Sequence, residues 1–180
     1  MARRIRYTGP PVLTVQDVVA WVRDDLANAE TALIESVIIP TVTAQCEADT
    51  GAAIRQAEYE EAWPVGLIHG ALDVGQATEV QTIIPVGSNG PAVPADQYRL
   101  QVGQRISHLT LEPGNSAQAL RITYLAGIDL EAYPAVRAWM LMYAATLWGQ
   151  REALVQGQIA PLPSPFLVSM LSDIIIPPRF

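Results

Sequence analysis

The chain has 180 residues and a mass of 19.5 kDa, and its side chains are 50% hydrophobic and 16% charged. This balance predicts one compact domain with its own core, and it excludes a disordered tail protein or a large two-domain enzyme. The 18 Asp and Glu residues outnumber the 11 basic residues, all of them Arg, and give a net charge of -7. That charge argues against a protein that holds duplex DNA by neutralising its phosphates.

No segment of the sequence indicates export or membrane insertion. Residues 1–11 begin with positive charges but continue into Thr8, Gly9 and two prolines instead of an apolar stretch, so no secretory signal is expected. The longest nearly apolar run, Ala138 to Trp148, is shorter than the roughly 20 residues that a membrane span requires. We therefore expect the protein to stay in the cytoplasm where it is made, without a membrane partner.

The first predicted elements are two helices. Thr14 is a good N-cap for a helix over residues 15–26, and Asp17 lies in its first turn, where the helix dipole favours a carboxylate. Asn28 is a candidate cap for a second helix over residues 29–50, which Gly51 closes by supplying a left-handed residue. Pro40 is expected to kink or split this second helix.

Residues 53–128 change to short β-favouring runs separated by Gly, Pro, Asn and Asp, which predicts a small, mostly antiparallel sheet. The expected strands are Ile54 to Glu60, Glu79 to Ile84, Tyr98 to Val102, Arg105 to Glu112 and Leu120 to Leu125. The predicted fold is therefore α+β, with a helical bundle into which a small antiparallel β-domain is inserted.

A third, longer helix is predicted over residues 134–156, with Pro134 at its first position, where the missing N–H does no harm. Its apolar surface is wider than the stripe of an ordinary surface helix. One interpretation is a central helix enclosed by its own domain. The other is that one side meets a neighbouring subunit, with Trp148, Arg151 and Glu152 near that boundary; in that case Trp139 belongs to the core.

The two ends of the chain are interpreted as arms flanking a domain over residues 12–156. The N-terminal arm, residues 1–11, carries Arg3, Arg4 and Arg6, which either contact nucleic acid or dock on the acidic body of an adjacent copy. The proline-rich C-terminal arm, residues 157–180, holds a short apolar helix over residues 166–173.

Beyond that helix, Ile174, Ile175 and Ile176 are followed by Pro177 and Pro178 and then by Arg179 and Phe180. This end is expected to add a strand or a plug to another chain. The alternative is that it folds back onto its own domain.

No arrangement of residues indicates catalysis or a cofactor. The two histidines, His69 and His108, are about forty positions apart without a neighbouring ligand at a metal-site spacing. Glu58, Glu60 and Glu61 form the densest acidic cluster, and Glu58 and Glu60, which alternate along a predicted strand, are expected to lie on its solvated face. The single Cys46 is expected to be a small buried side chain. We therefore expect no enzyme, no metal and no cofactor.

The order of these elements resembles the phage head-tail connector, or adaptor, family. Its opening helical pair is similar to Leu13–Arg23, Asn28–Glu35 and the closing Ala48–Gly51. Further segments resemble family motifs of two strands, a long helix and a C-terminal ending, in this order: Pro94–Leu100, Leu120–Gly127, Tyr133–Ala153, Leu162–Leu171 and Pro178–Phe180. The chain departs from the pattern at Gly51-Ala52-Ala53, where a Gly-Arg pair is common, and at Pro40, so the course of residues 38–55 is open.

The resemblance implies a structural protein of the virion neck without an active site. Such a protein forms a ring of twelve copies between the portal protein and the head-closure (stopper) or tail proteins, and the genomic DNA passes through its channel without specific binding. Its C-terminal segment, with Ile174, Ile175, Ile176, Arg179 and Phe180, reaches toward the portal. An acidic wall suits such a channel because it repels phosphate and lets DNA slide.

Two other functions remain open at this point. One is a neighbouring neck protein, either a head-closure or a tail-terminator protein. The other is a small ligand-binding domain or enzyme with a pocket formed by Trp63, Trp139, Tyr143 and Trp148.

Overall fold

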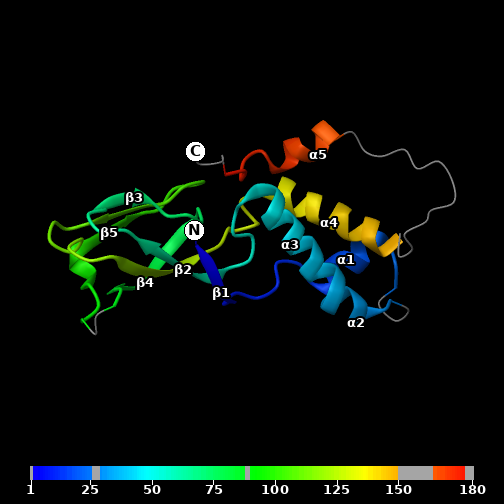
Figure 1. The fold of residues 1–180 in the computed structure, drawn as a ribbon. Coiled ribbons are helices and arrows are strands. Elements are labelled where there is room, and N and C mark those ends of the chain that lie inside the picture. Colours follow the sequence, from blue (N-terminus) through cyan, green and yellow to red (C-terminus); the bar gives the residue numbers. More distant parts are fainter. Residues whose placement is uncertain (1, 26–28, 88–89, 150–163, 177–180) are drawn as a thin grey trace. The chain divides into compact units, whose positions relative to one another are not determined.

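The structure is a computed structural model, and it describes residues 2–25, 29–87, 90–149 and 164–176. The fold is α+β, as predicted (Figure 1). Instead of one compact domain, the chain divides into two compact units. The β-unit comprises the described residues within 1–10 and 51–128 together with Ile176, and the helical unit comprises those within 11–50 and 129–175.

The first helix, α1 (Val15–Val22), begins as the sequence predicts. Thr14 Oγ1 accepts a hydrogen bond from the Asp17 N–H at 3.1 Å, and the Asp17 carboxylate accepts one from the Thr14 N–H at 2.8 Å. This reciprocal capping box satisfies two N–H groups that a helix start would otherwise leave unpaired. The helix ends earlier than the predicted residue 26 because Arg23 is left-handed, with φ of 58°. The expected cap Asn28 lies outside the described residues.

The second helical segment changes its winding along its length. It consists of α2 (Thr31–Leu33), the π-helical η1 (Ile34–Ile38) and α3 (Ile39–Thr50). Pro40 is the second residue of α3, and Ile39 separates it from the end of η1. Since proline has no N–H and its ring crowds the preceding turn, the wider π-helical turn before it accommodates the residue. The kink or split predicted at Pro40 is therefore observed as a change from π-helical to α-helical structure. Gly51 closes α3 with φ of +70°, as predicted.

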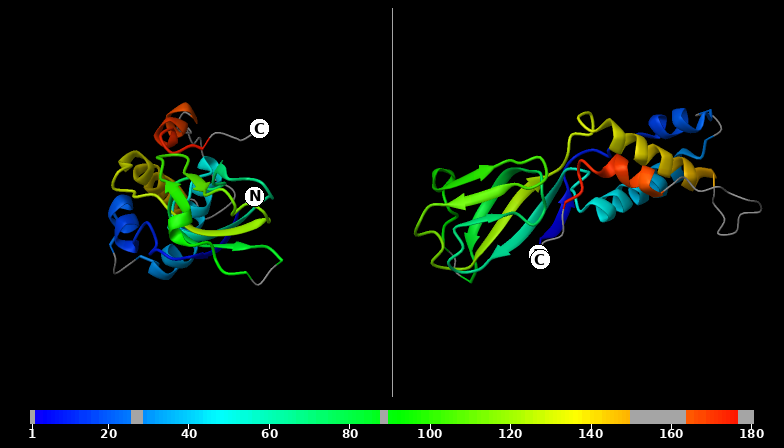
Figure 2. Two further views of the ribbon diagram at one scale, coloured as in Figure 1. Left: turned by 90° about the vertical axis from the view of Figure 1, so that its left-hand side faces the viewer. Right: turned by 90° about the horizontal axis from the view of Figure 1, so that it is seen from above.

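Helix α4 (Pro134–Gly149) begins at Pro134, as predicted, and runs beside α1 and α3 (Figure 2). Arg137 Nη2 donates to Asp17 Oδ1 at 2.8 Å and joins α4 to the first turn of α1. Trp139 is buried and stacks on Tyr143, one turn away, at 5.2 Å between ring centroids. Residues 150–156 of the predicted helix lie outside the described residues. The last helix, α5 (Ser164–Leu171), corresponds to the short helix predicted over residues 166–173.

The β-unit contains two antiparallel sheets where the sequence predicted one. The first has the strand order β1 (Arg3–Tyr7), β2 (Ala57–Trp63), β7 (Leu120–Ala126), β4 (Ala77–Pro85). The second has the order β3 (His69–Ala71), β6 (His108–Leu111), β5 (Tyr98–Gln101), and a 3-10 turn, η2 (Ala95–Gln97), precedes β5. Five predicted strands are present with shifted ends, while β1 and β3 were not predicted. The segment expected to be a basic arm is thus partly an edge strand.

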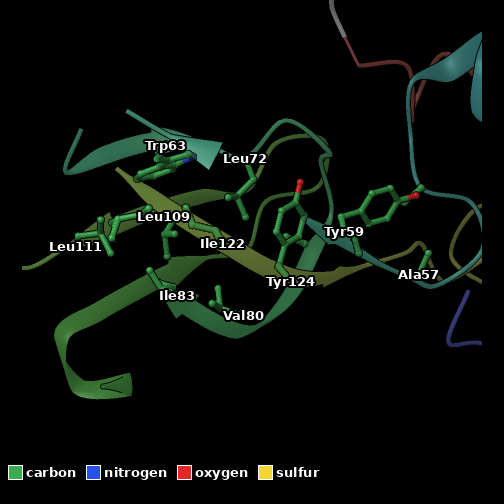
Figure 3. Close-up of a cluster of buried hydrophobic side chains, with 14 residues drawn as sticks. Ala57, Tyr59, Trp63, Leu72, Val80, Ile83, Leu109, Leu111, Ile122 and Tyr124 are labelled. Atoms are coloured by element: carbon green, nitrogen blue, oxygen red, sulfur yellow. The ribbon is translucent and has the colours of Figure 1, made fainter. Parts of the chain in front are cut away.

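The two sheets share one apolar core, because buried side chains of β2, β4, β6 and β7 point into it (Figure 3). Tyr124 and Ile122 of β7 lie there with Ile83 of β4 and Leu109 of β6, and all four are fully buried. Burial of this kind contributes about 25 cal/mol per Å² of apolar surface. Buried and less buried residues alternate along β2 and β7. This alternation is therefore the sequence property that places apolar side chains in the core.

We expect Thr14→Ala to lower the free energy of unfolding by about 1 kcal/mol, because the N-cap acceptor is lost. Thr14→Ser keeps the hydroxyl and is the matched control. Urea denaturation followed by far-ultraviolet circular dichroism measures both variants. If the Ala and Ser variants unfold at the same urea concentration, the capping box does not stabilise α1.

Candidate interaction surfaces and the buried carboxylate

Glu61 is the one member of the predicted acidic cluster that the structure buries, with 4% of its surface exposed. Glu58 and Glu60 lie on the opposite face of β2 and are half-buried. Glu58 and Glu60 share one face of the strand, as the sequence predicts, and Glu61 points to the other side because adjacent strand residues alternate. Glu61 shares its side with Tyr59 and Trp63, both core residues.

Each oxygen of the Glu61 carboxylate is hydrogen-bonded. Trp63 Nε1 donates to Oε1 at 2.6 Å, while the Asp73 N–H and the Tyr124 hydroxyl donate to Oε2 at 2.8 and 2.9 Å. The Tyr124 oxygen in turn accepts from the Val74 N–H at 3.1 Å. The bonds from Asp73 and Val74 hold the loop before β4 against β2 and β7, and the bond from Tyr124 joins β7 to β2. The group therefore supports the fold.

Burial raises the pKa of the Glu61 carboxyl, although the hydrogen bonds from Asp73, Trp63 and Tyr124 favour its charged form. Burial, together with the negative charge of Glu61, also raises the pKa of the Tyr124 hydroxyl. Burial raises the pKa of Cys46 to about 12, helped by Asp49 and Glu47. Its thiol is completely buried, as the sequence predicts, and is not activated as a nucleophile.

The N-terminal arginines find acidic partners in their own chain. Arg6 Nε lies 2.7 Å from Glu58 Oε2, and Arg3 Nη2 lies 3.3 Å from Glu60 Oε1. The Arg4 guanidinium lies over the Tyr7 ring at 4.2 Å from its centroid. The side chains of Arg3 and Arg6 stay 75% and 71% exposed, so these pairs are weak. Docking of this segment on another copy or on nucleic acid remains a prediction. The residues that would dock belong to a strand that is already paired with β2.

The two histidines, distant in sequence, are brought together by the pairing of β3 with β6. The His69 and His108 rings stack at 5.5 Å with an interplanar angle of 9°, and His69 Nδ1 lies 2.8 Å from Thr110 Oγ1. Sequence spacing could not reveal this neighbourhood, because the register of β3 against β6 creates it. Among the described residues, no group of three or more His, Cys, Asp or Glu is placed to hold a metal ion.

The C-terminal isoleucines are engaged with their own chain. Ile174 is completely buried, and both Ile174 and Ile175 donate their N–H groups to the Leu171 carbonyl. A Cβ built on Gly75 would lie 2.9 Å from Ile176 Cδ1, so that side chain sits tightly against the β-unit's own backbone. These residues form no strand, which favours the alternative that the segment folds back.

The remaining predicted interface residues are only partly described. Trp148 is half-buried in α4, in contrast to Trp139. Arg151, Glu152, Arg179 and Phe180 lie outside the described residues. A role for all of them in partner binding stays a prediction.

The aromatic residues considered for a ligand pocket are used in packing. Trp63 donates to Glu61 within the β-unit, and Trp139 stacks on Tyr143 within the helical unit. Two shallow grooves have other linings. One lies along α1, and the other lies at the end of the β-unit between the loops at Gly90–Pro94 and Gly114–Gln118. Within the described part of the chain, no helix has both the length and the hydropathy to cross a membrane.

Similarity to known proteins is found at the level of structure. No protein-family model and no curated protein sequence matches the chain. A chain of the virion of a native gene transfer agent particle matches with a TM-score of 0.70 and 17% identity. Chains from the neck of an empty particle, computed with C6 symmetry, and of a native particle, computed with C12 symmetry, match at 0.70 and 0.67 with 14% and 15% identity.

Each of these alignments covers 100% of this chain and 97% of the other chain. The likeness therefore extends from end to end and includes both units. It shows that this chain has the fold found in the virion and neck of gene transfer agent particles.

The raised pKa of Glu61 predicts how its contribution to stability changes with pH. The folded-state pKa lies above the ordinary value of 4.5, so the contribution is fully present below about pH 4.5 and is lost as the pH rises through the folded pKa. Glu61→Gln removes this titration. In urea denaturation, the stability of the native chain relative to this variant should fall as the pH rises above about 4.5, and a rise with pH would contradict the assignment.

Proposed function

We propose that this chain is a structural head-tail adaptor in the neck of a phage-like particle. In this role it forms a ring below the portal, joins the DNA-filled capsid to the tail and lines the DNA channel. The observation that carries the proposal is the end-to-end likeness to neck chains, with 100% and 97% coverage. The order of sequence motifs that resemble the adaptor family supports it independently.

The chemistry of the described residues agrees with a structural role. Glu61, the one buried carboxylate among them, has its oxygens occupied by three donors, and the buried Cys46 has a raised pKa. The net charge of -7 suits a channel protein, because an acidic wall does not hold a passing polyanion. We therefore place the chain in the virion, after assembly in the host cytoplasm.

The ring is proposed to close through contacts between neighbouring copies, with twelve subunits as the expected number. A repeated head-to-tail contact closes into a ring when its rotation allows. The half-buried Trp148 near the end of α4 is the proposed anchor, with Arg151 and Glu152 beside it in sequence. Trp139 is buried and stacked on Tyr143, and we propose that it stabilises the subunit itself.

We expect Trp148→Ala to abolish ring formation while the subunit stays folded, and Trp139→Ala to cost about 3 to 5 kcal/mol of stability. Light scattering and negative-stain micrographs of the purified protein, alone and with the portal protein, measure assembly, and thermal denaturation measures stability. A native protein that stays monomeric at high concentration in both conditions would remove the basis for a ring.

The terminal segment is proposed to dock on the portal. Ile174 is buried and Ile176 packs on Gly75, so we propose that only Pro177–Phe180 bind the portal. The planar guanidinium of Arg179 can donate two parallel hydrogen bonds to a carboxylate of the partner. Ile174 and Ile175 then anchor this segment instead of binding the partner.

A chain truncated after Ile176 should therefore unfold like the native chain but fail to bind portal-containing heads in co-sedimentation. Truncation after Asp173 removes the buried Ile174 and should also reduce stability. If the chain truncated after Ile176 still binds heads, the segment is not the portal anchor. Binding of the full chain to tail proteins but not to the portal would favour the head-closure or tail-terminator alternative.

A further inference from the structure

The net charge of this protein is divided unevenly between its two units. The stretches that form the helical unit, residues 11–50 and 129–175, hold 11 acidic residues and three arginines, a net charge of -8. The stretches that form the β-unit, residues 1–10, 51–128 and 176–180, hold seven acidic residues and eight arginines, a net charge of +1. The acidity of the chain therefore belongs to the helical unit, and the two units of neighbouring copies can attract each other.

The arginines of the β-unit gather around β1. Three of the five residues of this strand are arginines. The Arg4 and Arg55 guanidinium groups both lie over the Tyr7 ring, at 4.2 and 4.5 Å from its centroid. On β7, Arg121 Nε lies 3.7 Å from Glu60 Oε2. The basic β1 patch is the name used below for Arg3, Arg4, Arg6, Arg55 and Arg121, which outnumber the neighbouring carboxylates of Glu58 and Glu60.

The arginines of β1 keep donors for a further acceptor. Arg6 uses Nε on Glu58 and Arg3 uses Nη2 on Glu60, while their side chains stay 71% and 75% exposed. A guanidinium has five N–H donors, so each of the two can also bind a carboxylate of a partner. Since β1 is the outer strand of its sheet and Ile5 is 44% exposed, an apolar side chain is available beside these donors.

The helical unit has an exposed groove along α1. The groove measures about 540 Å³ and is lined by Gln16, Val19, Ala20, Arg23, Asp24 and Asp25. Trp21 of the same helix is 45% exposed, whereas Trp63 and Trp139 are buried. The groove and Trp21 are here called the α1 surface. A large exposed aromatic side chain beside a groove is typical of a protein contact.

Acidic groups outnumber basic ones on the α1 surface. Asp24 and Asp25 line the groove and are exposed. The Ala29 N–H donates to the Asp25 carbonyl at 2.9 Å, which brings the exposed Glu30 close to them. Arg23 is the one cation among the described residues that line the groove, so the three carboxylates leave a net negative charge.

These groups fit the side chain of an arginine. A carboxylate binds a guanidinium through two parallel hydrogen bonds, and an indole ring attracts it to its face. Val19 and Ala20 of the groove offer apolar contacts to the methylene groups of the same side chain. The α1 surface therefore has the chemistry that binds a strand rich in arginine.

We propose that the basic β1 patch of one copy docks on the α1 surface of the next copy in the ring. This inference rests on the proposed function. A ring needs two different patches of one chain that complement each other, and these two patches carry opposite charge. Contact between two helical units is disfavoured because each has a net charge of -8. DNA is disfavoured on the β1 patch because Glu58 and Glu60 lie among its guanidinium groups and repel phosphate.

The test reverses the charge of each surface separately. The β1 variant carries Arg3→Glu with Arg6→Glu, and the α1 variant carries Asp24→Arg with Asp25→Arg. Assembly of each purified variant is measured by light scattering over a range of concentrations, with the portal protein added if the native chain requires it. Thermal denaturation of the same samples measures whether each variant is folded.

Matched controls change the same amount of charge elsewhere in each unit. Arg99→Glu with Arg105→Glu alters two exposed arginines of the β-unit outside the patch, and Asp49→Arg with Glu131→Arg alters two exposed acidic residues of the helical unit outside the α1 surface. The β1 and α1 variants should need about tenfold higher concentration or more to assemble, because like charges then face each other. The controls should assemble near the native concentration.

An equimolar mixture of the β1 and α1 variants separates a lost contact from a lost fold. In the mixture, the reversed patch of one variant faces the reversed surface of the other, and the two native surfaces face each other in the next contact. Opposite charges are therefore restored throughout an alternating ring, and the mixture should assemble at a concentration within about threefold of the native one.

A cross-linking measurement locates the contact in an otherwise native chain. A photo-reactive amino acid replaces Ile5 or, as a control, Val102, which is 59% exposed elsewhere in the β-unit. Half of the chains are labelled with heavy isotopes, so mass spectrometry distinguishes cross-links between copies from those within one copy. Position 5 should cross-link to residues 15–25 of another copy, and position 102 should not.

The outcomes separate this inference from the function on which it rests. A native chain that forms no ring, alone or with the portal protein, overturns the proposed function and this inference with it. If the native chain forms rings but the β1 and α1 variants assemble like their controls, only the docking inference is wrong. A mixture of folded variants that stays dissociated, or cross-links from position 5 only to its own chain, to a different neck protein or to DNA, also overturns it.

Discussion

The β-unit depends on one strand, β7, and on the polar contact at its centre. β7 pairs with β2 on one side and with β4 on the other, and its inward residues Ile122 and Tyr124 fill the core shared with the second sheet. The Tyr124 hydroxyl meets the Glu61 carboxylate, which also receives the Trp63 indole and the Asp73 backbone. A buried carboxylate is tolerated only when its acceptors are satisfied. These bonds therefore fix the position of the loop that leads into β4, and through it the edge of the first sheet.

Ion pairs of this chain join two elements of the same unit. Arg3 and Arg6 of β1 pair with Glu60 and Glu58 of β2, and Arg137 pairs with Asp17 to join α4 to α1. Each of these contacts organises two elements within one unit. The side chains of Arg3 and Arg6 stay largely exposed, so the two pairs of β1 with β2 add little to stability.

The similarity to gene transfer agent chains persists at 14% to 17% identity because the fold constrains patterns more than particular residues. The capping box of Thr14 and Asp17, the left-handed Gly51 and the leading Pro134 specify where helices begin and end. Strands β2 and β7 need only alternate buried and exposed positions. Many sequences satisfy such requirements, which explains how a structural likeness covers a whole chain when no family model matches its sequence.

The sequence by itself determined the local structure of this protein: the start of α1, the end of α3, the start of α4 and the approximate positions of five strands. These depend on caps, glycine, proline and periodicity, which act within a few residues. Tertiary structure alone decided what depends on pairing between distant segments. Residues 3–7 became a strand because β2 offered an edge with acidic partners. Glu61 became buried because the register of β2 turned it toward Tyr124, and that position breaks the apolar alternation that sequence analysis follows. Ile174 became buried within its own chain, an outcome that depends on contacts with distant segments, which no local pattern encodes.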